Sequence, residues 1–265
     1  MRRWLMAKYG DVTKSEWIKE HGSAPVLLDA GCGAAMSGLA LWEGGLDRIN
    51  YIGVDISAAI DVAKKRFDEK KIKGSFIQCD LQTIPLPNES VDLIFSEGVL
   101  HHTDNTERAL CSVVKHLKVN GRIMFYVYRK KGPIREFTDD HIRDKLQNIS
   151  PEEGWREMQS LSKLGMLLGE LDIEIDIPDD ISVLDIPKGR LNLQRFFYWH
   201  VCKTFYRPEM TLDEMVHINY DWFAPKNAHR HTEQEVRKWC QDLNLTVERE
   251  IIEEAGITII AQKKG

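Results

Sequence analysis

The sequence predicts an α/β fold: a mostly parallel β-sheet with an antiparallel C-terminal strand, plus an inserted, mostly helical subdomain. Three observations support this fold class. From about residue 25 to residue 128, short apolar runs alternate with amphipathic segments, as in strands joined by crossover helices. Two strand-like runs near the C-terminus are joined by a link too short for a parallel pair. Between these regions, residues 130–230 interrupt the pattern with a segment longer than an ordinary loop.

Five strands are predicted in the N-terminal half, at residues 26–29, 51–55, 75–78, 91–95 and 122–128. Between them, apolar residues recur at helical spacing and are expected to cover the sheet: Ile60, Ala63 and Phe67 in one helix, and Leu110, Val113, Val114 and Leu117 in another. We expect Asp104, with Glu107 three residues later, to begin the second of these helices, and Asn120-Gly121 to stop it.

The C-terminal region predicts one more helix and two strands. Thr232 and Glu235 form a capping box for a helix with Val236, Trp239, Cys240 and Leu243 on one face. Runs 245–251 and 256–262 follow as strands, and they should be antiparallel because a parallel pair needs a crossover of about a dozen residues.

The chain is divided here into three parts. We assign residues 1–24 to an N-terminal helical segment, residues 25–129 and 231–265 to the core, and residues 130–230 to an inserted helical cap or substrate subdomain. Within the insertion, Ser150-Pro151-Glu152-Glu153 is a good helix start, followed by an apolar stripe at helical spacing. The acidic, proline-containing stretch 171–191 predicts a connector with extended pieces.

Composition limits the classes of function. The net charge of −5 argues against a surface that mainly neutralises phosphates, and so against a nucleic-acid partner. No apolar run approaches the roughly 20 residues that cross a bilayer, and Met1-Arg2-Arg3-Trp4 lacks the apolar segment of a secretion signal. We therefore expect a cytoplasmic protein. The five cysteines are widely spaced, with no C-x-x-C pair, which favours reduced thiols over disulfides or a zinc site.

A glycine-rich turn, Leu28-Asp29-Ala30-Gly31-Cys32-Gly33-Ala34, directly follows the first strand. Gly31 and Gly33 let the backbone bend sharply and let a ligand approach without a Cβ in the way. A dinucleotide fingerprint would need a third glycine where Met36 stands, which weakens the pyrophosphate interpretation.

This turn resembles the acidic-x-G-x-G motif of class I, Rossmann-like S-adenosylmethionine-dependent methyltransferases. The resemblance continues in order with Asp55 at the end of the second strand, Asp80 after the third, and Ser96-Glu97-Gly98-Val99-Leu100-His101-His102 after the fourth. It implies a mostly parallel seven-stranded sheet with an antiparallel C-terminal strand. Family members often have a third glycine at the position of Ala35, and this departure adds only one methyl group.

The same resemblance implies S-adenosylmethionine as the cofactor and S-adenosylhomocysteine as the product. Asp55 would accept hydrogen bonds from both ribose hydroxyls, and Asp80 and Leu81 would contact the adenine. The cofactor-binding residues expected on this basis are Asp29, Gly31, Cys32, Gly33, Asp55, Ile56, Asp80, Leu81, Ser96 and Glu97. Structural alternatives remain open, since Asp29 could satisfy backbone donors at the strand end and Asp80 could cap a turn before Pro85.

Methyl transfer is an in-line displacement, in which alignment and exclusion of water supply much of the rate. A base is needed mainly when the acceptor carries a proton at neutral pH. The candidates are His101, His102 and Glu97. Adjacent histidines do not face the same way, so at most one should reach the acceptor while the other packs or caps.

Aromatic residues suggest where the acceptor binds. The run Phe196-Phe197-Tyr198-Trp199-His200 could close over an acceptor, form a homodimer contact or pack inside the insertion. The substrate-wall candidates are Tyr198, Tyr220, Trp222 and His229, the last three placed just before the final helix. His229-Arg230-His231 has no clear carboxylate partner, so we predict no metal site.

The function predicted from these residues is transfer of a methyl group to a small molecule or biosynthetic intermediate. The alternatives are an RNA or protein methyltransferase, whose binding would weaken steeply with salt, and a non-catalytic protein that binds the cofactor.

Overall fold

The computed structural model describes residues 1–265 and divides into two compact units. Unit 1 comprises residues 1–129 and 229–265, and unit 2 comprises residues 130–228. The predicted insertion ended at residue 230, but Arg230 and His231 form a short strand on the sheet of unit 1, so His229 and Arg230 belong to that unit.

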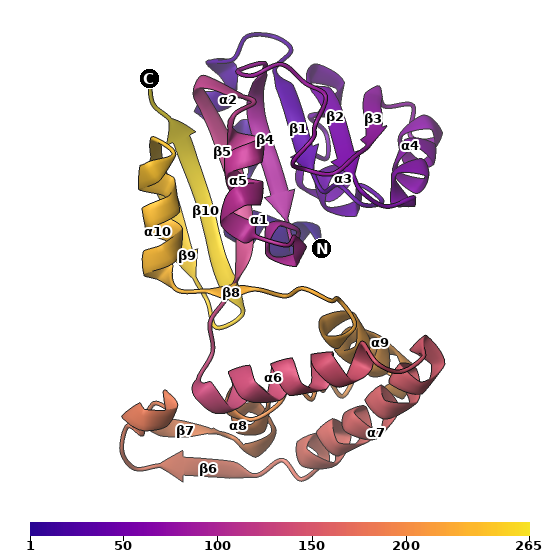
Figure 1. Ribbon diagram of the computed structural model, residues 1–265, viewed down its shortest axis with the longest axis vertical. Helices are drawn as coiled ribbons and strands as arrows, with labels where there is room; N and C mark the ends of the chain where they lie inside the picture. Colours follow the sequence, from indigo (N-terminus) through magenta and orange to yellow (C-terminus); the bar gives the residue numbers. More distant parts are fainter. The chain divides into compact units, whose positions relative to one another are not determined.

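Unit 1 alternates strands and helices along the chain (Figure 1). Its strands are β1 (Val26–Ala30), β2 (Asn50–Asp55), β3 (Gly74–Gln78), β4 (Val91–Glu97), β5 (Leu117–Arg129), β8 (Arg230–His231), β9 (Leu245–Ile252) and β10 (Gly256–Lys263). Its helices are α1 (Arg2–Tyr9), α2 (Glu16–Lys19), α3 (Met36–Leu41), α4 (Ala59–Glu69), α5 (Thr106–Val114) and α10 (Glu233–Asp242). Short 3₁₀ turns cover Val12–Lys14, Leu46–Arg48 and Leu100–His102.

The sheet confirms the predicted fold class. Its strand order is β3-β2-β1-β4-β5-β10-β9, and the two-residue β8 pairs with β5 off this path. Strands β1 to β5 pair in parallel, whereas β10 runs antiparallel to both β5 and β9. The short link between β9 and β10 leaves a hairpin as the only way to pair them.

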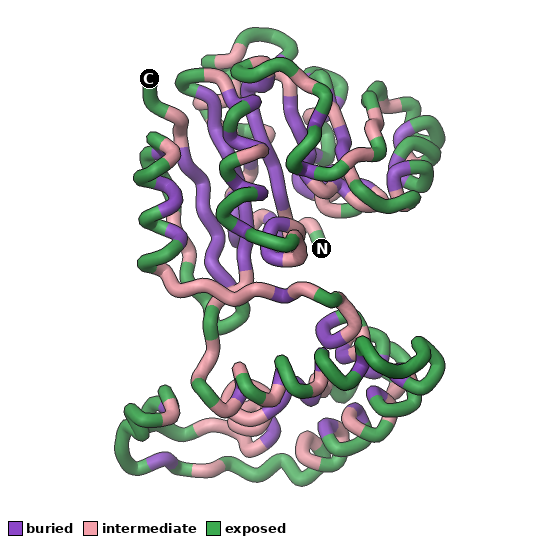
Figure 2. The backbone as a smooth tube through the Cα atoms, in the orientation of Figure 1, coloured by how far each residue is buried: buried purple, intermediate pink, exposed green.

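Helices cover both faces of this sheet because neighbouring strand residues point to opposite faces. Leu28 and Ile94 pack with α5 and α10 on one face, whereas Leu27 and Leu93 pack with α1, α3 and α4 on the other. Figure 2 shows β4, β5 and β10 buried along most of their length and the outer turns of the helices exposed. The core therefore consists of two apolar layers with the sheet between them.

Two local predictions in unit 1 were wrong. Asn105, not Asp104, caps α5, because its side chain accepts a hydrogen bond from the Arg108 N–H at 2.8 Å. Asn120 and Gly121 lie inside β5 instead of ending the helix, which stops at Val114. They form an irregularity in the β4–β5 pairing, where Asn120 adopts a φ of 66°.

Unit 2 contains four helices and a small antiparallel hairpin. Helices α6 (Pro133–Leu146), α7 (Pro151–Glu170), α8 (Leu193–His200) and α9 (Leu212–Phe223) surround a core that includes Met158, Met215, Val216 and Phe223. The stretch predicted to be extended forms β6 (Glu174–Ile177) and β7 (Gly189–Asn192), with a 3₁₀ turn at Ser182–Leu184 between them. Ser150 and Glu153 form the predicted capping box of α7.

None of the helices has both the length and the apolar character that a membrane span requires. All five cysteines are unpaired.

Candidate cofactor-binding site

The site of unit 1 is built at the carboxyl ends of β1, β2 and β4, where open parallel sheets place their ligands. Directly after β1, the Gly31 and Cys32 N–H groups donate to the Val54 carbonyl of β2, at 2.8 and 2.9 Å. Gly31 has a φ of 80°, and a Cβ there would lie 2.2 Å from Cγ1 of Val99. Only glycine fits this position.

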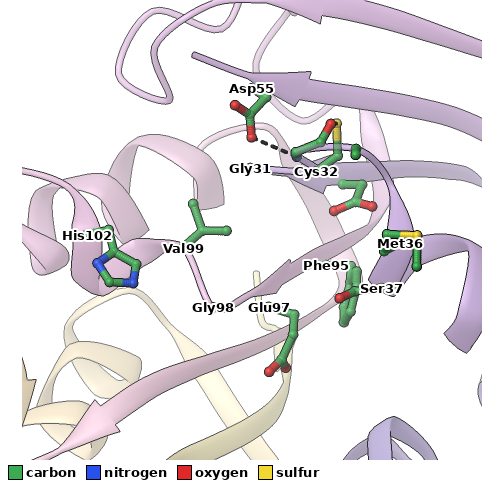
Figure 3. Close-up of a pocket in the computed structure, with 13 residues that line it drawn as sticks. Gly31, Cys32, Met36, Ser37, Asp55, Phe95, Glu97, Gly98, Val99 and His102 are labelled. Carbon is green, nitrogen blue, oxygen red and sulfur yellow. Dashed lines mark hydrogen bonds between the residues drawn. The ribbon is translucent and has the colours of Figure 1, made fainter. Parts of the chain in front are cut away.

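Asp55, the last residue of β2, holds the glycine loop in place. Its Oδ2 accepts a hydrogen bond from the Gly33 N–H at 2.7 Å (Figure 3). Its Oδ1 accepts two more, from the N–H and the hydroxyl of Ser57, at 2.8 and 2.6 Å. The carboxylate is therefore fixed in position before any ligand binds.

Two adjoining cavities run along this edge, with volumes of about 330 and 230 Å³. Both are lined by Gly31, Asp55, Val99 and His102. In Figure 3 the residues around the larger cavity come from the ends of β1, β2 and β4, from the segment that follows β4, and from the start of α3. An elongated ligand could lie across the glycine loop and occupy both.

Most of the residues predicted to bind cofactor line these cavities. Asp29, Gly31, Cys32, Gly33, Asp55 and Glu97 line the larger one, and Gly31, Asp55, Ile56, Asp80 and Leu81 line the smaller one. Ser96 lines neither. It is fully buried within β4, and its hydroxyl donates to the Ala30 carbonyl at 2.9 Å, so it joins two strands.

Asp29 is both a lining residue and a buried one, with 3% of its surface exposed. Burial raises its pKa to about 7, and the hydroxyl of Tyr51, which donates to Oδ2, opposes this shift. Asp80 is exposed, and its Oδ1 accepts a hydrogen bond from the Gln82 N–H at 2.7 Å. This bond caps the turn, which is the structural role that the sequence left open for Asp80.

The two adjacent histidines occupy different environments. His102 lines both cavities, whereas His101 lines neither and has no exposed surface. The His101 ring packs on Tyr128, with centroids 3.6 Å apart. Burial lowers the pKa of His101 well below its usual range, and His102 lowers it further. His101 is therefore placed for packing, and His102 is the histidine that faces the site.

Glu97 is tied to the N-terminal helix. Its Oε1 lies 2.7 Å from Nζ of Lys8, and its Oε2 accepts a hydrogen bond from the Tyr9 hydroxyl. The Lys8 ammonium also lies 3.4 Å from the ring centroid of Tyr126. Burial lowers the pKa of Lys8, and Glu97 opposes that shift.

Sequence reasoning missed Lys8 and Tyr9, because nothing in α1 marks a lysine as buried. It also missed other lining residues: Met36, Ser37 and Phe95 of the larger cavity, and Gln82, Thr103 and Asp104 of the smaller. Gly98 and Val99 lie in the segment quoted for the family resemblance, and that resemblance could have identified them as lining residues.

The substrate-wall candidates do not line the two cavities. Tyr198 lies in α8, and Tyr220 and Trp222 lie inside α9 instead of leading directly into the final helix. Trp222 is buried in unit 2, where its indole N–H donates to Oδ2 of Asp139 at 3.1 Å. The His229 N–H donates to the His101 carbonyl at 2.9 Å within unit 1. No group of three or more His, Cys, Asp or Glu side chains is arranged to hold a metal ion.

Comparison with known proteins agrees with this geometry. The profile of the methyltransferase domain family matches residues 28–125, which include the glycine loop and β4. The phthiotriol/phenolphthiotriol dimycocerosates methyltransferase of Mycobacterium leprae is 26% identical over 128 residues, which are 48% of this chain and 46% of that protein. Human "Probable tRNA methyltransferase 9B" is 24% identical over 131 residues, 48% of this chain and 26% of that protein.

The chain thus spans about half, or less, of the length of these curated relatives. A solved structure of a SAM-dependent methyltransferase from Methanosarcina mazei covers 94% of this chain and is itself covered to 98%, with a TM-score of 0.50 and 15% identity. At 15% identity, the structural likeness supports the fold assignment alone. The profile match assigns residues 28–125 to the methyltransferase domain family. The strand order and this structural likeness show that the chain has the class I, Rossmann-like fold of S-adenosylmethionine-dependent methyltransferases.

Proposed function

We propose that unit 1 binds S-adenosylmethionine in the two adjoining cavities and that the chain transfers the methyl group to a small-molecule acceptor. One observation carries the cofactor assignment. The cavities are lined by the carboxylates of Asp29, Asp55, Asp80, Glu97 and Asp104 and by no lysine or arginine. Such a lining suits a cofactor with a sulfonium, an ammonium and ribose hydroxyls, and it disfavours the pyrophosphate of a dinucleotide.

The proposed contacts follow from the positions of these side chains. Asp55, already oriented by Gly33 and Ser57, is assigned to the ribose hydroxyls. Asp80 and Leu81 of the smaller cavity are assigned to the adenine. Asp29 and Glu97, on the larger cavity, are assigned to the methionine part, where a positive charge is best stabilised by buried carboxylates.

The cofactor supplies an electrophilic methyl group, and the protein's part is to align the acceptor and exclude water. His102 is the proposed proton acceptor when the acceptor carries a proton, because it lines both cavities. Glu97 is a weaker candidate for that role, since both of its oxygens already bond to Lys8 and Tyr9. His101 is assigned a packing role.

The acceptor is proposed to be a small molecule because the net charge of −5 disfavours a polyanionic partner. The relatives are named both for a small-molecule substrate and for tRNA, so their names support either class. The salt dependence of acceptor binding distinguishes the two classes. RNA binding should weaken by orders of magnitude between about 50 and 200 mM salt, whereas binding of an uncharged small acceptor should change little.

Titration calorimetry tests the cofactor assignment. We expect S-adenosylmethionine and S-adenosylhomocysteine to bind the full chain, and NAD not to bind. Asp55→Ala should abolish binding, while Asp68→Ala, on the exposed surface of α4, should leave it unchanged. NAD binding, or no binding of S-adenosylmethionine, would contradict the proposal.

Release of S-adenosylhomocysteine during an acceptor screen then tests catalysis. A wild-type chain that binds the cofactor but yields no product with any acceptor class would support the non-catalytic alternative. For a protonated acceptor, His102→Ala should lower the turnover rate by about 10²-fold or more while cofactor binding persists.

A further inference from the structure

Unit 2 contains a buried lysine whose ammonium has no partner of opposite charge. Lys203 has 8% of its surface exposed, and its Nζ lies 4.3 Å from the ring centroid of Trp222. No carboxylate or carbonyl of the protein accepts a hydrogen bond from it. This residue lies in the connector between α8 and α9, outside every part of the site described above.

A second buried cation, Arg135, stands near it, together with one buried anion. Asp139 is fully enclosed, and its Oδ1 accepts from Nε of Arg135 at 2.7 Å. Its Oδ2 accepts from the Trp222 indole at 3.1 Å. Both oxygens of Asp139 are therefore engaged, and its charge offsets that of Arg135. The positive charge of Lys203 is left over.

The remaining charged groups that act on Lys203 are Asp221, which is exposed on α9, and Lys131, whose charge opposes protonation. Burial lowers the pKa of Lys203 to about 7, and Arg135 contributes to the same shift. A buried charge without a partner costs several kcal/mol, so proteins usually pair it or neutralise it. A cluster with one cation in excess is suited to an anionic ligand.

Arg135 is itself enclosed, and its Nη1 donates to the Tyr198 carbonyl, so it adds positive charge without contacting a ligand. We propose that Lys203 forms a binding site for an anionic oxygen group, a carboxylate or a phosphate. The ammonium is not among the fully enclosed, unpartnered polar atoms, so part of its surface is exposed. The rings of Trp222 and Tyr198 flank the two cations and would contact a flat molecule that carries the anion.

A purely structural role for Lys203 makes a different prediction. If the side chain only packs over Trp222, a small anion in solution should neither bind near it nor change its titration. The anion-site proposal predicts both, because an oxyanion beside the ammonium favours the protonated form and raises its pKa.

Ligand-observed NMR on the full chain gives the first readout, with benzoate, phenyl phosphate and the neutral isostere benzamide as probes. We expect at least one of the two anions to bind wild type and benzamide not to. Lys203→Met should weaken binding by at least about tenfold, since a hydrogen bond to a charged group is lost. Lys203→Arg should retain it, and Lys163→Met, on the exposed surface of α7, should match wild type.

Amine-reactive labelling with mass spectrometry gives the second readout. It uses the wild-type chain, so its result does not depend on whether a variant folds. The binding anion should slow labelling of Lys203 near pH 7 to 8, and benzamide should not. Preferential binding of benzoate or of phenyl phosphate identifies the group as carboxylate or phosphate. Binding of neither anion, or equal binding to Lys203→Met, overturns the proposal. Cofactor titration on the same samples separates this failure from failure of the proposed function, because that site lies in unit 1.

Discussion

Three carboxylates line the larger cavity, and the protein holds each in a different way. Asp55 accepts hydrogen bonds from backbone and hydroxyl groups, Asp29 is buried against Tyr51, and Glu97 is paired with Lys8 and Tyr9. Their types and approximate places could be predicted from the sequence, because Asp29 and Asp55 end predicted strands and Glu97 follows one. Their partners could not, since Tyr51 and Lys8 come from other elements.

The burial of Asp29 should make stability depend on pH. Its pKa is about 7 in the folded chain and about 4 when unfolded, so between these values the folded state binds more protons. The stabilisation from proton binding at Asp29 is fully present below pH 4 and is lost as the pH rises through 7. The free energy of unfolding should fall by up to about 4 kcal/mol over this range.

Urea denaturation between pH 4 and 8 would measure this loss against an Asp29→Asn variant. Asparagine can still accept a hydrogen bond from Tyr51 but does not titrate in this range. We expect the difference in unfolding free energy between wild type and variant to change across the window. A constant difference would show that Asp29 does not titrate there.

Gly31 offers a test of the close approach at the glycine loop. Gly31→Ala should suffer both the strain of a φ of 80° and a clash of the new Cβ with Val99 at 2.2 Å. Gly22→Ala is a matched control, because Gly22 has the same φ of 80° and nothing within 4 Å of the added Cβ. The control should lose about 1–2 kcal/mol, and Gly31→Ala about 1–3 kcal/mol more.

Chemical denaturation measures both effects on stability, and calorimetry should show loss of cofactor binding only in Gly31→Ala. Equal destabilisation of the two variants would mean that Val99 moves away at little cost.

At the level of elements, α1 shows how a short N-terminal helix becomes part of a site. Leu5 and Tyr9 bury one face of it against the sheet, and Tyr9 meets Phe95 edge to face at 5.5 Å. The same helix carries Lys8 to Glu97, so the ordering of α1 and the position of that carboxylate are linked. An N-terminal helical segment was predicted from sequence, but this linkage was not.

Lys8→Met should therefore weaken α1. The change leaves Glu97, whose side chain is 5% exposed, without its cation, and breaking a buried pair typically costs about 3–5 kcal/mol. Hydrogen exchange should become faster in residues 2–9, and the double variant Lys8→Met with Glu97→Gln should recover part of the loss. Lys14→Met, at a side chain 81% exposed, serves as the control. Unchanged exchange in residues 2–9 would argue against the linkage.

At the level of the whole molecule, the lining of both cavities comes entirely from unit 1. We expect S-adenosylmethionine to slow hydrogen exchange in residues 31–37, 55–57 and 97–103 and to leave α7 and α9 unchanged. At a hundred times the dissociation constant, ligand binding stabilises the folded site by about 2.7 kcal/mol. Exchange through opening of the site should slow by about a hundredfold, and Asp55→Ala should remove the effect. Equal protection of α7 and α9 would contradict this prediction.

The sequence alone determined the fold class and the approximate bounds of most strands of unit 1. Alternating apolar runs specify strands and crossover helices, and capping boxes such as Ser150 with Glu153 act within one turn, so local chemistry is sufficient. The glycine loop and the acidic residues after the strands were found for the same reason. That residues 130–230 serve as a substrate cap stays a prediction.

Tertiary structure decided what local chemistry leaves open. The pairing of Lys8 with Glu97, the burial of His101 beside the cavity-lining His102, and the leftover charge of Lys203 all depend on side chains from distant segments. A sequence pattern reports which face of an element is apolar, but not which charge ends inside or what it meets there. Burial and partners set the pKa of such groups, and both exist only once the chain has folded.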